Sequence, residues 1–226
     1  SFNFELNLEA KMKYKAVIFD MDGTILNTLE DLKNATNYSL KQFGMPERSF
    51  EEVRMFVGNG IRKLVERAVP AGTSEQKIDE VLDVFLKYYA VHSADNTSAY
   101  PGIHGLVENL KKEGIKTAVS TNKADAPAQE LGKEYFNGIF DLIVGQRDGL
   151  RTKPAPDSVN EILRILNIQK KDAVYVGDSD VDIQTAKNSG LDFIGVSWGF
   201  RGREFLEKNG AKNIVDNANE ILDLVK

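Results

Sequence analysis

The chain has 226 residues, of which 42% are hydrophobic and 28% are charged, and its formal net charge at pH 7 is −5. A chain of this size buries a substantial core, and its mixed charges provide no basic surface for nucleic acid or anionic lipid, so we expect neither as a partner. The sequence has no cysteine, which excludes disulfides, thiolate zinc sites and cysteine catalysis, and no apolar run approaches the roughly 20 residues of a membrane span. We therefore expect a cytoplasmic globular protein of one or two domains.

The first predicted element is a buried strand at residues 16–19. Residues 1–12 come before it, and we interpret them as a non-native or disordered extension outside the fold. The strand leads into a turn at Gly23, and Asp20 and Asp22 lie between the strand and the turn. Ligand crevices of α/β sheets open at the carboxyl ends of strands, so we expect the two acids to lie at a site. The alternative is that both acids only form the turn, as Asp and Gly often do.

Residues 28–97 contain no convincing strand and read as helices. Apolar residues recur at helical spacing over residues 29–43 and again over residues 78–89. We therefore predict an all-helical cap domain at residues 28–97, inserted into a core domain that is formed by residues 13–27 and 98–226.

From residue 98 onward, short apolar runs alternate with amphipathic segments of helical length. Further strands are predicted at residues 115–120, 139–144, 173–176, 193–196 and 213–215. Helices are predicted at residues 103–113, 158–166, 180–189 and 218–225. This alternation predicts an α/β fold with a Rossmann-like, mostly parallel sheet covered by helices on both faces.

Polar residues follow four of the predicted strands or lie in the loops after them. They are Asp20 with Asp22, the run at residues 120–123, Lys153 in TKPAPD, and the run at residues 178–182. Because the carboxyl ends of parallel strands share one edge of a sheet, we expect the four groups to converge.

A site of carboxylates, a hydroxyl and a lysine, with no required His or Cys, suits phosphoryl transfer to an aspartate. Carboxylates alone would repel a phosphoryl group, so we expect Mg²⁺ as the cofactor, held by Asp20 and Asp178. Lys153 and Thr121 would contact phosphate oxygens, with Ser120 as a competitor for the place of Thr121. The plainer alternative is a set of turn residues, helix caps and surface lysines that carries no chemistry.

The motifs DMDGT, STNK, TKPAPD and GDSDVD resemble those of the haloacid dehalogenase-like superfamily in kind and order, and the resemblance spans nearly the whole chain from residue 15. It implies a Rossmann-like core with an inserted helical cap. It also implies that Asp20 is the nucleophile that becomes an aspartyl-phosphate and that Asp22 is the general acid and base. Thr121 and Lys153 match the pair that holds the phosphate.

The same resemblance implies the set of metal ligands. Asp20, the backbone carbonyl of Asp22 and Asp178 match the Mg²⁺ ligands of the superfamily. Asp182 matches either a further ligand or an acceptor for metal-bound water.

The acid at Asp22 favours phosphatase or phosphomutase chemistry over dehalogenation, because an alkoxide leaving group must be protonated. Four longer stretches resemble the phosphoglycolate phosphatases, namely FVGNGIRKLVERAV, STNKAD, KPAPDSV and GVSWGFRGREFLEKNGA. This resemblance implies hydrolysis of 2-phosphoglycolate. Pyrophosphatase, sugar-phosphate phosphatase and β-phosphoglucomutase-like activities stay open, as does a non-catalytic binding protein on this scaffold. In each case the partner is a small phosphorylated metabolite, and the chain is expected to be a monomer or homodimer.

Candidate substrate contacts, besides Thr121 and Lys153, are Gly23, Asn122 and Arg62. Arg62 is predicted either to pair with a substrate carboxylate or to lie on a helix surface. Trp198 and Phe200 are predicted to pack against the last helices rather than to stack on a ligand.

Overall fold

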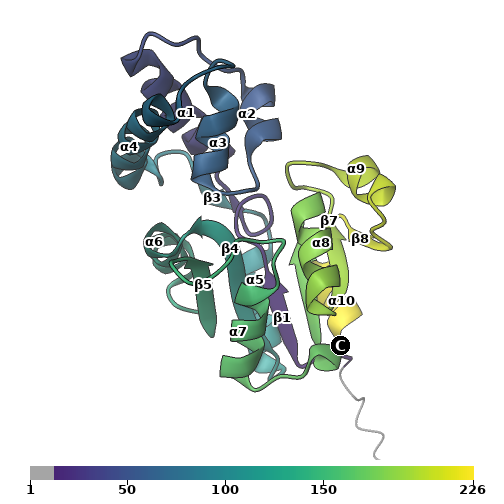
Figure 1. The fold of residues 1–226 in the computed structure, drawn as a ribbon. Coiled ribbons are helices and arrows are strands. Elements are labelled where there is room, and N and C mark those ends of the chain that lie inside the picture. Colours follow the sequence, from purple (N-terminus) through teal and green to yellow (C-terminus); the bar gives the residue numbers. More distant parts are fainter. Residues whose placement is uncertain (1–12) are drawn as a thin grey trace, which may run out of the picture.

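The computed structural model describes residues 13–226, and the predicted N-terminal extension at 1–12 lies outside them. Figure 1 shows a helical part, called the cap below, above an α/β part, called the core. Among the described residues, no helix is both long enough and apolar enough to cross a membrane.

The core is built on a six-stranded sheet whose strand order is β5-β4-β1-β6-β7-β8, and every neighbouring pair is parallel. The strands are β1 (Ala16–Phe19), β4 (Lys116–Ala124), β5 (Leu142–Gln146), β6 (Ala173–Gly177), β7 (Asp192–Val196) and β8 (Asn213–Val215). This arrangement confirms the predicted mostly parallel α/β sheet. In register, Phe19, the last residue of β1, lies opposite Val119 of β4 and Val176 of β6, so the residues that follow these three positions lie near one edge of the sheet.

Helices cover both faces of the sheet, as predicted. Alternate residues of β1 point to opposite faces: Val17 and Phe19 belong to one apolar cluster, and Ala16 and Ile18 belong to another. The first cluster includes residues of α5 (Ile103–Lys112), α6 (Asp125–Phe136) and α10 (Ala218–Val225). The second includes residues of α7 (Asp157–Leu166) and α8 (Asp180–Ser189). A central strand buried on both faces explains why its sequence is a continuous apolar run.

Some elements differ from the sequence prediction. Strand β4 continues to Ala124, four residues beyond its predicted end, and β5 begins three residues late, at Leu142. Helix α6, the short 3₁₀ turn η1 (Lys170–Asp172) and α9 (Arg203–Lys208) were not predicted. Polar residues 120–123 concealed the continuation of β4, because they have the composition of a loop.

The cap consists of α1 (Leu29–Gln42), α2 (Phe50–Phe56), α3 (Ile61–Ala68) and α4 (Glu75–His92). A capping box begins α2, in which the Ser49 side chain accepts from the backbone N–H of Glu52 and the Glu52 side chain accepts from that of Ser49. The apolar stripes of the helices form a hydrophobic cluster separate from those of the core. The cap therefore has its own small hydrophobic centre.

The two chain segments that join the cap to the core pair with each other. Strands β2 (Leu26–Asn27) and β3 (Ser98–Ala99) form an antiparallel ribbon. We propose this ribbon as the boundary between the two domains. The sequence did not predict it, because two residues are too few to show a strand period.

Asp31 ties the first helix of the cap to the second connection. The buried carboxylate of Asp31 accepts hydrogen bonds from the backbone and side-chain amides of Asn96, at 2.9–3.1 Å, and from Thr97 Oγ1 at 2.7 Å. These bonds fix where the chain returns from the cap to the core.

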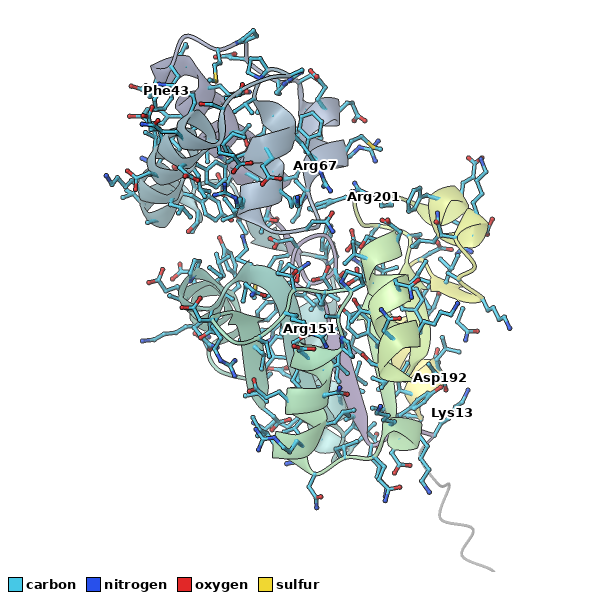
Figure 2. All side chains as sticks on the ribbon, in the orientation of Figure 1. Lys13, Phe43, Arg67, Arg151, Asp192 and Arg201 are labelled. Carbon is cyan, nitrogen blue, oxygen red and sulfur yellow. The ribbon has the colours of Figure 1, made fainter. Side chains whose placement is uncertain are left out.

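A loop of the core also reaches the cap, and Figure 2 shows Arg201 of this loop near the cap. The guanidinium of Arg201 donates to the backbone oxygens of Arg54 at 2.5 Å and Val57 at 2.7 Å, at the end of α2. In return, Arg54 donates to the backbone oxygen of Phe200. The ring of Phe200 belongs to the cap cluster, so the prediction that it packs against the last helices was wrong; Trp198 packs on the core cluster that includes α10.

We expect Asp31→Ala to lower the free energy of unfolding by about 2–3 kcal/mol, because it removes a buried carboxylate that accepts hydrogen bonds from Asn96 and Thr97. Urea unfolding measures the change. Glu30→Ala removes an exposed acid from the same turn and should cost no more than about 0.5 kcal/mol. Equal costs for the two variants would contradict a special role for Asp31.

Candidate active site

The polar groups singled out in the sequence come together at one edge of the sheet. Asp20 directly follows β1, Thr121 lies near the end of β4, and Asp178 directly follows β6. Because β1 lies between β4 and β6, with Phe19 opposite Val119 and Val176, these residues lie side by side.

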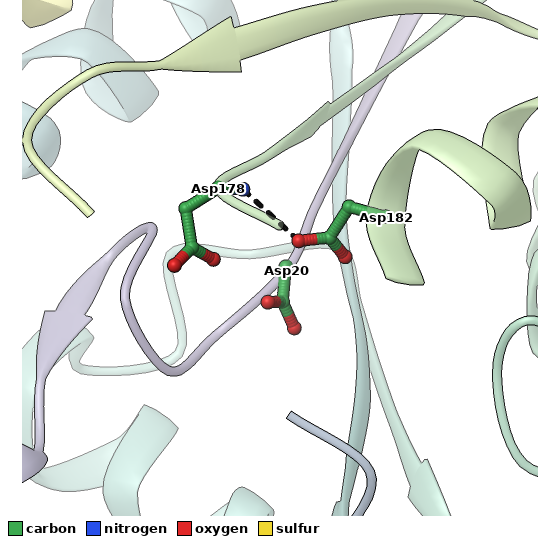
Figure 3. Close-up of side chains that lie close together, drawn as sticks. All are labelled: Asp20, Asp178 and Asp182. Atoms are coloured by element: carbon green, nitrogen blue, oxygen red, sulfur yellow. Dashed lines mark hydrogen bonds between the residues drawn. The ribbon is translucent and has the colours of Figure 1, made fainter. Parts of the chain in front are cut away.

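Asp20, Asp178 and Asp182 form a carboxylate cluster (Figure 3), in which one oxygen from each residue lies within 4.8 Å of the others. Asp182 comes from the first turn of α8. Its Oδ2 accepts from the backbone N–H groups of Asp178 at 3.0 Å and Ser179 at 3.2 Å. Asp182 therefore holds the loop that carries Asp178.

The two oxygens of the Asp178 carboxylate accept hydrogen bonds from two different chain segments. Its Oδ1 accepts from Thr24 Oγ1, and its Oδ2 accepts from the backbone N–H of Phe200, each at 3.0 Å. Gly23 has a φ of +85°, and a Cβ there would lie 2.3 Å from Asp178 Oδ2; one at Gly199 would lie 2.2 Å from Asp178 Cβ. Gly23, predicted as a substrate contact, is thus required for the close approach of the first loop to Asp178.

Lys153 is buried next to the cluster. Its Nζ donates to Asp20 Oδ1 at 2.9 Å and to Ser120 O and Tyr175 OH at 2.7 Å each, and it lies 3.4 Å from Asp182 Oδ1. Tyr175 OH in turn donates to Asp182 Oδ1 at 2.7 Å. One ammonium group therefore faces two buried carboxylates.

The cluster carries more negative charge than Lys153 offsets. Burial raises the pKa of Asp20 well above its ordinary value; Asp182 and Asp178 raise it further, whereas Lys153 lowers it. Burial and the charge of Asp182 likewise raise the pKa of Asp178 to about 7, against the backbone N–H of Phe200 and the hydroxyl of Thr24.

The donor set fits a hard divalent cation. Carboxylate oxygens are the ligands that Mg²⁺ prefers, and a cation would favour the charged forms of these acids. Of the three acids, Asp20 and Asp178 are the better candidates for metal ligands. Asp182 already accepts from the loop amides, Tyr175 and Lys153, and suits an acceptor role beside the ion.

Asp22 lies beside the cluster, on the wall of a pocket between core and cap. Its Oδ1 accepts from Thr28 Oγ1 at 2.6 Å and lies 3.4 Å from Lys123 Nζ. Lys123 is buried and donates to Tyr89 OH of α4 at 2.8 Å. Burial alone would lower the pKa of Lys123, but Asp22 and Tyr89 raise it by more, so the ammonium stays charged.

The polar residues at 120–122 of β4 make different contacts. Thr121 lines the pocket, and its Oγ1 accepts from the Lys123 backbone N–H at 3.1 Å, which leaves its hydroxyl proton free to donate. Ser120 Oγ instead forms a buried hydrogen bond with Ser158 Oγ at 2.6 Å, and neither residue lines the pocket. Asn122 also lines the pocket, but its amide bonds to the backbone of Lys153 and to Gly58 O of the cap.

Arg62 does not reach the pocket. Its guanidinium pairs with Glu66, Glu75 and Asp79 on the surface of the cap, with 43% of the side chain exposed. The cap wall of the pocket is formed instead by apolar side chains and glycines, namely Leu32, Val57, Gly58, Gly60, Ile61 and Leu64.

The sequence did not identify several residues that support the candidate site through hydrogen bonds. The sequence pattern places Tyr175 in a run of buried strand residues, although a tyrosine among aliphatic residues signals a hydroxyl that needs a partner. Thr24, Tyr89 and Phe200 act through contacts between distant segments, and no local pattern marks them.

Comparisons with known proteins agree with this geometry. Residues 17–196 match the family model described as haloacid dehalogenase-like hydrolase. Phosphoglycolate phosphatase 1 of Pseudomonas aeruginosa is 31% identical over 92% of this chain and 78% of its own, and phosphoglycolate phosphatase of Aquifex aeolicus is 33% identical over 82% and 86%.

A solved structure from Lactobacillus delbrueckii subsp. bulgaricus is also similar. It superposes with a TM-score of 0.90 and is 40% identical, over 95% of this chain and 99% of its own. Its own description assigns it provisionally as a phosphoglycolate phosphatase.

The raised pKa of Asp178 predicts how stability depends on pH in metal-free protein. Between about pH 4 and about 7 the folded protein keeps a proton that the unfolded chain has released, so raising the pH favours unfolding. With EDTA present, we expect the free energy of unfolding of wild type to fall between about pH 4 and about 7 by on the order of 3 kcal/mol more than that of Asp178→Asn. Urea unfolding at several pH values measures the difference.

The matched control for this experiment is Asp180→Asn, which removes an exposed carboxyl two residues away, at the start of α8, and should leave the wild-type slope unchanged. If wild type and Asp178→Asn have parallel pH profiles, Asp178 does not hold the extra proton.

Proposed function

The chain belongs to the haloacid dehalogenase-like hydrolases and is a phosphatase, and from this premise we propose that it hydrolyses 2-phosphoglycolate through an aspartyl-phosphate at Asp20, with Mg²⁺ as cofactor. The observation that carries the proposal is the buried group formed by Asp20, Lys153 and Asp178 at the carboxyl edge of the sheet. It combines a carboxylate nucleophile, a fixed cation and a place for a metal.

In the first step, the Asp20 carboxylate attacks phosphorus and forms a new O–P bond. The bond from phosphorus to the ester oxygen breaks, and the carboxylic acid of Asp22 gives its proton to that oxygen, which leaves as an alcohol. Thr121 donates its hydroxyl to a phosphoryl oxygen, and Lys153 offsets negative charge at Asp20 and the phosphoryl group.

In the second step, water attacks phosphorus and gives a proton to the Asp22 carboxylate. The bond between Asp20 and phosphorus breaks, inorganic phosphate leaves, and both aspartates return to their starting states. Mg²⁺, held by Asp20, Asp178 and the backbone carbonyl of Asp22, would neutralise charge on the transferring group. The apolar side chains that the cap contributes to the pocket wall would limit access of bulk water to the site.

The substrate assignment rests on the relatives. Several relatives near 30% identity are phosphoglycolate phosphatases, and the pocket suits a small phosphorylated metabolite. Pyrophosphatase, sugar-phosphate phosphatase and phosphomutase activities use the same core residues and are the alternatives that the substrate panel below separates. Cytoplasmic location and a monomeric or homodimeric state stay predictions.

We expect Asp20→Asn to lower turnover at least about 10³-fold while the substrate still binds, because an amide does not act as the nucleophile. Phosphate release and substrate binding by calorimetry measure the two effects. Asp180→Asn, an exposed acid close in sequence to Asp178, should stay within about threefold of wild type. If Asp20→Asn still turns over substrate at a rate near that of wild type, the proposed covalent mechanism at Asp20 is contradicted.

A panel of phosphate compounds tests the activity itself. With Mg²⁺ we expect 2-phosphoglycolate to have the highest kcat/KM among 2-phosphoglycolate, pyrophosphate and hexose phosphates, and we expect EDTA to abolish turnover until Mg²⁺ is restored. A different best substrate would correct the substrate alone. An isomerised sugar phosphate without phosphate release would identify a mutase, and no turnover of any member would contradict the proposed function.

A further inference from the structure

Lys123 is a buried cation that the proposed mechanism does not use. Its side chain is 2% exposed, and its Nζ lies 3.4 Å from Asp22 Oδ1 and 2.8 Å from Tyr89 OH. The same Nζ lies 4.6 Å from the centroid of the Tyr89 ring. Burying an ammonium is costly unless it is paired, so these contacts account for its position.

The contacts of Asp22 are unequal at its two oxygens. Oδ1 faces both Thr28 Oγ1 and Lys123 Nζ, whereas within residues 13–226 no hydrogen bond from the protein reaches Oδ2. Asp22 also lines the pocket. A carboxyl anchored through one oxygen keeps the other available for proton exchange with a bound molecule.

We propose that Lys123 is a positioning residue for Asp22, and that with Thr28 it anchors Oδ1 so that Oδ2 exchanges the proton with the leaving oxygen. The inference rests on the proposed function, since it assigns a support to the acid of that reaction. Lys153 serves the nucleophile Asp20, and Lys123 serves the proton donor Asp22, so the two buried lysines have separate tasks.

Tyr89 extends this support to the cap. Tyr89 lies on α4 and is buried in the cap cluster, whereas Lys123 lies on β4 of the core. Their hydrogen bond crosses the boundary between the two parts. The position of Lys123, and through it that of Asp22, therefore depends on a residue that the cap supplies.

Substrates with different leaving groups distinguish a positioning role for Lys123 from a general structural role. An alkyl phosphate needs a proton on its departing oxygen, whereas p-nitrophenyl phosphate releases a stable phenolate without one. We compare kcat/KM, which covers only the steps up to departure of the alcohol, for 2-phosphoglycolate, ethyl phosphate and p-nitrophenyl phosphate.

For Lys123→Met we expect kcat/KM to fall about 100-fold with both alkyl phosphates and less than about threefold with p-nitrophenyl phosphate. Lys123→Arg keeps the positive charge and should recover part of the loss. Tyr89→Phe removes only the hydroxyl and should give a smaller loss with the same pattern, about 3- to 10-fold with the alkyl phosphates. Lys63→Met, a lysine paired with Glu66 on the cap surface, is the matched control and should behave as wild type.

Equal losses with all three substrates in Lys123→Met would overturn the inference, because they indicate a structural role. A loss confined to 2-phosphoglycolate would also overturn it, because Lys123 would then bind the substrate carboxylate. If Lys123→Met does not fold, judged by its melting curve, Tyr89→Phe decides by the same criterion. Absence of turnover in wild type contradicts the proposed function, whereas an active wild type with a uniform defect in the variants contradicts only the role of Lys123.

Discussion

The architecture of the site depends on burying several carboxylates at one edge of a sheet. One carboxylate oxygen from each of Asp20, Asp178 and Asp182 lies within 4.8 Å of the other two, and taking like charges out of water is unfavourable unless each is paired. The chain meets this requirement with a buried lysine, Lys153, a buried tyrosine, Tyr175, and amide donors from two loops. The charge that these groups leave uncompensated makes the site fit for a divalent cation and for a phosphoryl group bound with it.

The same requirement links the active site to the cap. Asp178 accepts from the backbone of Phe200, whose ring packs in the cap cluster, while the next residue, Arg201, holds carbonyl oxygens at the end of α2. A single loop therefore contacts a metal-ligand candidate with its backbone and the cap with its side chains. Movement of the cap relative to the core would disturb these contacts, which is consistent with closure of the cap completing the site.

The fold was largely predictable because its signals are local. The apolar run before Asp20 and the alternation of strands and helices after residue 98 gave the parallel sheet, and the convergence of Asp20, Thr121 and Asp178 followed from topology. The supporting contacts were not predictable. Whether Arg62 faces the pocket or the acids of α4 depends on the packing of two helices, and the pairing of Lys123 with Tyr89 joins residues 34 positions apart.

The two buried lysines differ in what holds them, and the difference has a functional consequence. Every contact of Lys153 named above comes from the core, so Asp20, the proposed nucleophile, has this partner independently of the cap. Lys123 contacts Asp22 in the core but also Tyr89 in the cap. In the proposed mechanism, the attacking group Asp20 is thus prepared in advance, whereas the proton donor Asp22 is fully supported only when the cap is in place. Such a division would restrict the chemistry to the closed, water-excluding form.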